Sequence, residues 1–166
     1  MPNVFGESTP NAAGMRVAIV ASIFNDQFTK RLCNGAVTTA REHGVADEAI
    51  DVFWVPGAFE IPLVAGELAA SGSYDAIACV GAVVRGETPH FDYVAGETAR
   101  GIREAGCDSG VPMGFGIITA DTLEQAEARS GGSVGNKGSE AMYAALHVAA
   151  LLREVVTTED DEEDEA

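Results

Sequence analysis

The chain has 166 residues, 46% of them hydrophobic, which is enough for one domain with a sizeable buried core. Its 26 acidic and 10 basic residues give a formal net charge of −16, and this balance excludes the cationic face that nucleic-acid or membrane-surface binding requires. Apolar runs fall short of the ~20 residues that span a bilayer, and the amino terminus lacks the pattern of a secretory signal, so we expect a cytoplasmic protein.

The amino-terminal segment, residues 1–14, is rich in Pro, Gly and Asn and carries one apolar pair, Val4-Phe5. We expect an arm there, which adds an edge strand to a neighbouring subunit. A β-branched run over residues 16–21 predicts the first strand. Asn25 then suits the cap of a helix whose apolar residues recur at helical spacing up to His43-Gly44.

The next elements alternate between apolar runs and helical patterns. The predicted strands lie at 50–55, closed by Pro56-Gly57, at 76–84 and at 111–119. The predicted helices lie at 60–70, at 91–105 and from a cap at Asp121 or Thr122 through Arg129. A glycine-rich segment at 131–138 then precedes a last helix at 139–155. Four apolar strands alternating with helices indicate a parallel sheet covered on both faces, a three-layer α/β/α sandwich. Residues 15–156 would form this single domain.

Residues 157–166 form an acidic tail with seven consecutive acids from Glu159 to Glu165, which we expect to be disordered and solvated. The body without the tail still has more acids than bases, and only two of its bases are lysines, Lys30 and Lys137. Such an acidic, lysine-poor surface suggests adaptation to high salt, because repulsion between neighbouring protein molecules keeps the protein in solution there.

Three widely spaced cysteines, Cys33, Cys79 and Cys107, form no CxxC pair. They indicate neither a zinc site nor a disulfide framework, and we expect free thiols in a reducing compartment, with no bound metal.

Aromatic and polar residues gather where the predicted strands end. Phe24 follows the first strand, Phe59-Glu60 the second, and the loop Gly86 to His90 the third. Because parallel strands end along one edge, these residues should share a ligand site. Each also has a structural alternative. Phe24 could be a hydrophobic staple, Glu60 a favourable charge at a helix start, and His90 a histidine that bonds nearby backbone.

Arg129 and Lys137 flank a glycine-rich segment that is either a flexible joint between helices or an anion site for phosphate. It lacks the order of a Walker A loop. Gly86 and Thr88, before a helix, could bind the same phosphate through backbone N–H groups. Arg85 is a second candidate cation, or it pairs with an acid.

These fragments together resemble the lumazine synthase family over residues 16–154. Its marks here are Phe24-Asn25, Pro56-Gly57-Ala58-Phe59-Glu60, the loop from Gly81 to Tyr93, Phe115-Gly116-Ile117, Glu124-Gln125-Ala126, and Arg129 with Gly135-Asn136-Lys137-Gly138. Each mark alone is weak, but together in this order they are specific. The resemblance implies a flavodoxin-like sheet with strand order 2-1-3-4.

The family joins 5-amino-6-(D-ribitylamino)uracil to 3,4-dihydroxy-2-butanone 4-phosphate and releases phosphate and water, without metal or cofactor. The resemblance implies a role for each site residue. For the ribitylaminouracil, Phe24 stacks on the pyrimidine, Ala58, Phe59 and Glu60 hold the ribityl chain, Ala82, Val83 and Val84 hold the uracil edge, and Phe115 forms a wall of the pocket. It also implies that Glu87, Thr88 and Arg129 bind the phosphate ketone, that His90 transfers protons, and that Lys137 and Glu140 support the site.

The resemblance also implies a homo-oligomer, either a pentamer or a shell of twelve pentamers, with Phe115 and Arg129 reaching a neighbour's pocket and a riboflavin synthase as a partner. Ser22-Ile23 before Phe24 departs from the commonest family sequence, and the acidic tail is foreign to its core. Three alternatives remain open: an archaeal-type riboflavin synthase, a non-catalytic flavin or lumazine carrier, and a structural shell protein.

Overall fold

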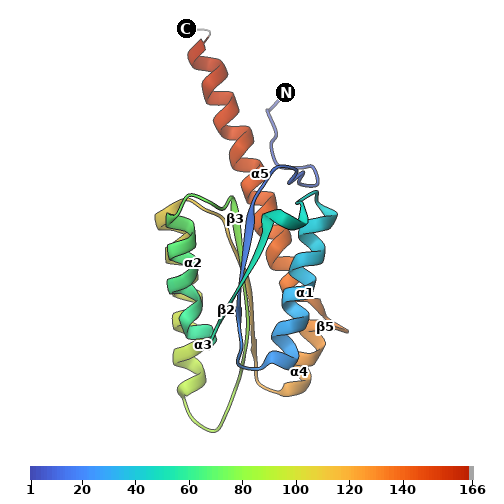
Figure 1. The fold of residues 1–166 in the computed structure, drawn as a ribbon, viewed down its shortest axis with the longest axis vertical. Helices are drawn as coiled ribbons and strands as arrows, with labels where there is room; N and C mark the ends of the chain where they lie inside the picture. Colours follow the sequence, from blue (N-terminus) through green and yellow to red (C-terminus); the bar gives the residue numbers. More distant parts are fainter. Residues whose placement is uncertain (165–166) are drawn as a thin grey trace.

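The computed structural model describes the backbone of residues 1–164 and the side chains of residues 1–157. Its centre is a parallel sheet of β1 (Val17–Ser22), β2 (Ile50–Val55), β3 (Ala76–Val84) and β4 (Met113–Ala120). The strand order is β2-β1-β3-β4, so the predicted order 2-1-3-4 is confirmed. Helices cover both faces of this sheet (Figure 1), which makes the three-layer α/β/α sandwich expected from the sequence.

Each face of the sheet has its own helices. On one face lie α1 (Asp26–Glu42), α4 (Leu123–Arg129) and α5 (Lys137–Asp164). On the other lie α2 (Ile61–Ala70) and α3 (His90–Ser109), which pack against each other. Two 3₁₀ turns also belong to the fold, η1 (Asp47–Ala49) before β2 and η2 (Ala58–Glu60) before α2. None of the helices in the described part of the chain has the length and apolarity needed to cross a bilayer.

Side chains that alternate between the two faces of the central strands divide the core into two clusters. In β1, Val17, Ile19 and Ala21 belong to the cluster beneath α1 and α5, whereas Ala18 and Val20 belong to the cluster beneath α2 and α3. Successive strand residues point to opposite faces, so a strand with two covered faces is mostly apolar. β1 is fully buried, and its one polar residue, Ser22, stands at its carboxyl end.

Two glycines let α5 lie directly on its neighbours. A Cβ atom at Gly114 of β4 would overlap the backbone carbonyl of Ala141, and one at Gly138 would overlap that of Leu32 in α1. Backbone atoms cannot move aside as a flexible side chain can, so the packing of α5 requires glycine at both positions.

The segment expected as a joint or anion loop contains a small antiparallel hairpin of β5 (Ser130–Gly132) and β6 (Gly135–Asn136). Gly131 and Gly135 have φ values of +102° and +83°, which side chains rarely adopt. The sequence did not indicate these strands, because two or three small residues show no alternation. Elsewhere the boundaries move by a few residues: α3 begins at His90 rather than residue 91 and continues past 105 to Ser109.

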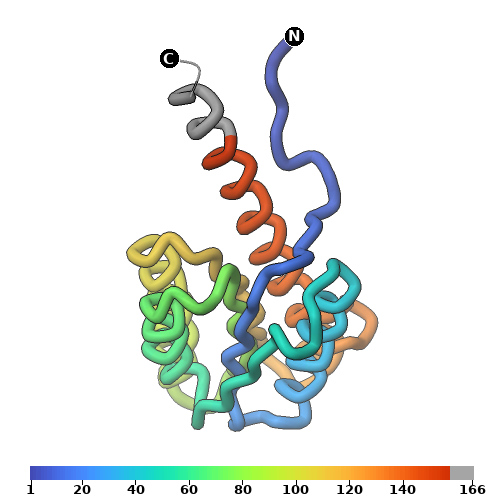
Figure 2. The backbone as a smooth tube through the Cα atoms, turned by 45° about the horizontal axis from the view of Figure 1, so that its top comes forward, coloured from blue at the N-terminus to red at the C-terminus, as the bar shows by residue number. Residues whose placement is uncertain are grey.

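Both ends of the chain leave the body on the same side (Figures 1 and 2). Residues 1–14 form no strand with the rest of the described chain, and Gly6 lies against Leu151 and His147 of α5. α5 continues past the expected end at residue 155 to Asp164. The backbone of residues 157–164 belongs to this helix, whereas the expectation was a disordered tail over residues 157–166. The side chains of residues 158–166 and the backbone of residues 165 and 166 lie outside the described residues.

Candidate active site

A cleft of about 750 Å³ lies at the carboxyl edge of the sheet. Parallel α/β proteins bind ligands at this edge. Most of the residues proposed from sequence lie here: Phe24, Ala58, Phe59, Glu60, Ala82, Val83, Val84, Thr88 and His90. Three chain segments far apart in the sequence therefore meet around one cavity.

Phe24 forms one wall of the cleft, and backbone pairing fixes its position. The N–H groups of Ile23 and Phe24 donate to the carbonyls of Val55 and Pro56 at 2.8 and 3.0 Å, which continues the pairing of β1 with β2. The Phe24 side chain is 71% exposed. A hydrophobic staple would bury its ring against the helix, so this exposure disfavours the staple and leaves an open aromatic face.

Asn25 occupies the N-cap position of α1, but the expectation that its side chain caps the helix is wrong. Its φ and ψ of 62° and 43° are left-handed, whereas capping side chains sit on extended backbone. Its Nδ2 instead donates to the carbonyl of Ala82 at 2.8 Å. This bond ties the Phe24 turn to the floor of the cleft, and Asn25 itself lines the cavity.

The turn η2 forms another part of the cleft lining. Ala58 is buried, while Phe59 is 60% exposed and Glu60 is exposed. The Glu60 carboxylate folds back over Gly57, where a Cβ atom would lie 3.0 Å from Oε2. η2 packs against α3, so the carboxylate and the face of α3 border the same part of the cleft.

The loop after β3 brings Thr88 and His90 to the cleft. The hydroxyl of Thr88 accepts a hydrogen bond of 3.4 Å from the backbone N–H of His90, the first residue of α3. Val94 and Glu97, one and two turns further along α3, also line the cleft, as do Phe91 and Tyr93. The sequence motifs did not indicate Val94 and Glu97, although their spacing from His90 puts all three on one helix face.

The sequence left two roles open for Arg85, a cation for phosphate or a partner of an acidic residue, and in the structure it pairs with acidic residues. Its guanidinium contacts Asp121 at 2.7 Å and Asp92 at 3.3 Å. The hydrogen bond with Asp121 raises the pKa of Arg85 above its ordinary value. Arg85 is not among the residues that line the cleft.

The structure does not bring the remaining predicted residues to this cleft within one chain. Arg129 ends α4, and its guanidinium bonds the carbonyl of Gln125 at 3.1 Å. Lys137 and Glu140 pair at 2.7 Å in the first turn of α5. Glu87 is exposed on the loop but outside the cavity lining.

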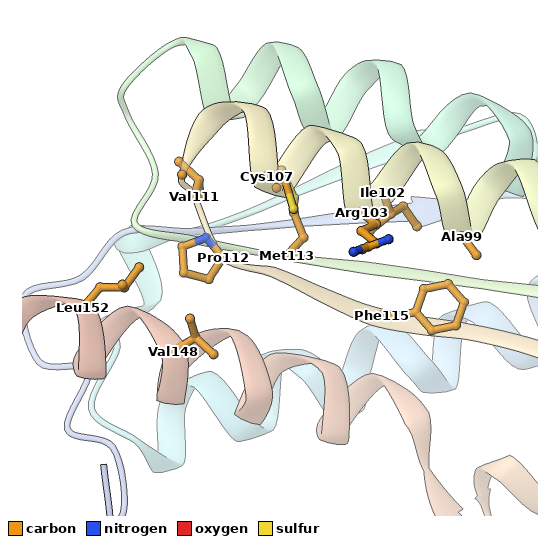
Figure 3. Close-up of a pocket in the computed structure, with 12 residues that line it drawn as sticks. Ala99, Ile102, Arg103, Cys107, Val111, Pro112, Met113, Phe115, Val148 and Leu152 are labelled. Carbon is orange, nitrogen blue, oxygen red and sulfur yellow. The ribbon is translucent and has the colours of Figure 1, made fainter. Parts of the chain in front are cut away.

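Phe115 lies in a second cavity, an open groove of about 530 Å³. The groove lies between α3 and α5 along the edge strand β4, with Val148 and Leu152 on one side and Ile102 on the other (Figure 3). Phe115, Val148 and Leu152 are 47%, 42% and 44% exposed. The groove therefore presents apolar side chains that the described part of the chain leaves partly exposed.

A parallel α/β sheet whose carboxyl edge holds a cleft with aromatic, carboxylate and imidazole groups is the arrangement of an enzyme that acts on a small organic molecule. Residues 14–153 match the family model described as 6,7-dimethyl-8-ribityllumazine synthase. A relative of that name from Gemmatimonas aurantiaca (strain DSM 14586 / JCM 11422 / NBRC 100505 / T-27) is 52% identical over 155 residues, which cover 93% of this chain and 94% of the relative.

The chain belongs to the 6,7-dimethyl-8-ribityllumazine synthase family, and the resemblance seen in its motifs is confirmed. It is a transferase of riboflavin biosynthesis that acts on small-molecule substrates.

Proposed function

We propose that this chain condenses 5-amino-6-(D-ribitylamino)uracil with 3,4-dihydroxy-2-butanone 4-phosphate in the cleft at the carboxyl edge. The product is 6,7-dimethyl-8-ribityllumazine, and phosphate and water leave. The observation that carries this assignment is the meeting of Phe24, Glu60 and His90 around one cavity. An aromatic face suits a pyrimidine, a carboxylate suits a polyol, and an imidazole suits repeated proton transfer.

The pyrimidine ring stacks on Phe24, whose face is open to the cleft. Its polar edge meets the backbone of Ala82, Val83 and Val84 at the end of β3. Ala82 is buried in the sheet, so this floor is rigid. The Asn25 bond to the Ala82 carbonyl then holds the stacking ring and the floor in register.

The ribityl chain lies along η2. The Glu60 carboxylate accepts hydrogen bonds from its hydroxyls, and the backbone of Ala58 and Phe59 completes the contact. The position of η2 between the cleft and α3 supports this assignment. A carboxylate that accepts several hydrogen bonds makes strong charge-assisted contacts, which suits a polyol.

The ketone phosphate binds at the start of α3. Gly86 and Thr88 line the cleft next to the start of α3, where the positive end of the helix dipole favours an anion. Glu87 contacts the polar end of the same substrate. The charge of the phosphate also needs a cation, and we assign this role to Arg129 of a neighbouring subunit, with Lys137 and Glu140 in support.

His90 transfers protons during imine formation, phosphate loss and ring closure. Its position in the cleft, next to Thr88, supports this role. A well-placed general acid or base contributes typically 10²–10⁴-fold to a rate. Holding two substrates in one cavity contributes much of the rest.

We propose that the chain works as a homo-oligomer, a pentamer that can build a shell of twelve pentamers. Arg129 lies outside its own chain's cleft, and Phe115 faces the exposed apolar groove. A neighbour seated on the groove would bury it and receive Phe115 as a pocket wall. The exposed Val4-Phe5 arm adds a strand to a neighbour, where edge strand β2 exposes Val52 and Trp54.

A riboflavin synthase is the proposed partner that consumes the product. We place the enzyme in the cytoplasm, where its three free cysteines stay reduced.

The decisive experiment supplies purified protein with both substrates and follows lumazine formation and phosphate release together. We expect equal amounts of the two products, and neither when one substrate is omitted. Absence of both would overturn the proposal. Riboflavin formed from lumazine alone would indicate a riboflavin synthase, and tight flavin binding without turnover would indicate a carrier.

A further inference from the structure

Arg85 is fixed at the point where β3 gives way to the loop that carries Thr88 and His90. Its backbone N–H donates to the carbonyl of Ala120 at 2.8 Å, one step beyond the last paired residues of β3 and β4. The backbone of Arg85 is therefore held by the sheet. The loop that follows is exposed from Gly86 to His90, and a Cβ atom at Gly86 would meet no other atom within 4 Å.

The guanidinium of Arg85 contacts two parts of the chain on either side of this loop. Its Nε donates to Asp121, which follows β4, at 2.7 Å. Its Nη1 lies 3.3 Å from Asp92, and its central carbon lies 4.3 Å from the centre of the Phe91 ring. Phe91 and Asp92 are the two residues directly after His90 in the first turn of α3.

The far end of this arrangement is also anchored. The backbone N–H of Asp121 donates to the side chain of Gln125 at 2.8 Å, and the Thr122 hydroxyl caps α4 by accepting from the Gln125 N–H. These two bonds hold Asp121 at the end of β4 and the start of α4. Because the loop from Gly86 to His90 has no buried side chain of its own, the contacts of Arg85 with Asp121, Phe91 and Asp92 link the first turn of α3 to the sheet.

We propose that Arg85 is a positioning residue for the proposed reaction, whose guanidinium holds the first turn of α3 so that His90 meets the reacting atoms. Two carboxylates neutralise it, and it stays outside the cleft, so it acts through His90 and not on the phosphate. This inference rests on the proposed function. A misplacement of about 1 Å can cost as much as 10²-fold in rate.

The test compares Arg85→Ala and Arg85→Lys with the wild-type enzyme in steady-state assays of lumazine formation. We expect kcat to fall by about 10- to 100-fold in Arg85→Ala while KM for the ribitylaminouracil stays within about twofold. Arg85→Lys keeps the charge but loses the planar fork and the stacking on Phe91, so it should recover little of the rate. Arg100→Ala serves as the control, because Arg100 pairs with Glu104 within α3 and should leave kcat unchanged.

A double substitution separates positioning from direct contact. If Arg85 acts through His90, Arg85→Ala should have less than about a twofold effect in a His90→Ala background. An undiminished effect there, or a rise in KM for the ketone phosphate with kcat preserved, would overturn the proposal and make Arg85 a phosphate ligand. Asp121→Asn and Phe91→Leu remove the two sides of the tether separately and keep the test open if Arg85→Ala fails to fold. Inactive wild-type protein would refute the proposed function itself, whereas active wild type with unchanged Arg85 variants refutes only the tether.

Discussion

Asn25 shows how one side chain can set the geometry of a binding cleft. It adopts a left-handed backbone conformation, which Asn tolerates better than most residues, and its amide spans to the carbonyl of Ala82. Phe24 precedes it directly. The left-handed turn therefore points the aromatic face of Phe24 at the cleft, and the hydrogen bond from the Asn25 side-chain amide to Ala82 keeps it there.

We expect Asn25→Ala to destabilise the fold by about 1–2 kcal/mol, because it adds a left-handed alanine and removes a hydrogen bond. Asn25→Gly relieves the backbone strain but still lacks the bond. Denaturant unfolding of the two variants separates the contributions. Both should raise KM for the ribitylaminouracil, since Phe24 is no longer held; an unchanged KM in both would show that the amide does not position the ring.

Arg129 provides a test of shared sites, because it lies outside the cleft of its own chain. Arg129→Ala should raise KM for the ketone phosphate far more than KM for the uracil, since a dianion loses its cation. Arg41→Ala, which removes an arginine paired with Asp47 elsewhere, should change neither value.

Co-expression gives the sharper result. Subunits with Arg129→Ala and subunits with His90→Ala should restore activity when they assemble together, because some clefts then receive His90 from one chain and Arg129 from the other. If both groups came from the same chain, mixing would leave every site defective and activity would not return.

Asp51 connects stability to pH at the end of the sheet away from the cleft. It accepts hydrogen bonds from Tyr74 at 2.8 Å and from Arg16, and these partners, Tyr74 first, lower its pKa. A depressed folded pKa means that this stabilisation is present above the unfolded value of about 3.9 and is lost as pH falls through the folded value. Asp51→Asn should therefore be less stable than wild type at pH 5–7, and the difference should shrink below about pH 4 in denaturant titrations. A constant difference across this range would contradict the assignment.

The helix α5 depends on close backbone packing. Gly114→Ala would drive a methyl group into the carbonyl of Ala141, so we expect a loss of several kcal/mol or failure to fold. Gly96→Ala is the matched change in open space, where a Cβ atom meets no neighbour. On the exposed surface of α3 it should raise stability by up to about 1 kcal/mol. Thermal unfolding of the two variants distinguishes packing from helix propensity.

The elements that the sequence predicted best are those with strong patterns. β3 is an uninterrupted apolar run, and its bounds agree with the expectation at 76–84. The β5–β6 hairpin has no such pattern, because glycines give no periodicity. The sequence did not indicate the partners of Arg85 either, since Asp92 lies in α3 and Asp121 follows β4, and only the folded sheet brings them together. Phe115 was assigned correctly to β4, but its groove depends on the separate approach of α3 and α5.

At the scale of the whole molecule, two features have opposite effects on the proposed assembly: the apolar groove favours contact between subunits, and the net charge of −16 opposes it. Val148→Glu places a charge in the groove, and burying it unpaired would cost several kcal/mol, so we expect a smaller assembly by light scattering. Ala46→Glu adds the same charge at an exposed position outside the groove and should preserve the assembly. Wild-type assembly should strengthen with added salt, which screens repulsion between subunits. An unchanged mass in Val148→Glu at low salt would exclude the groove as an interface.

The direction of α5 has a practical consequence. This helix projects beyond the sheet on the side opposite the carboxyl edge, next to the amino-terminal arm (Figure 1). A protein fused to either terminus, or a solid support attached there, would therefore sit at the far end of the molecule from the cleft proposed as the active site. The fold thus suits display or immobilisation through its ends, with substrate access preserved at the other side.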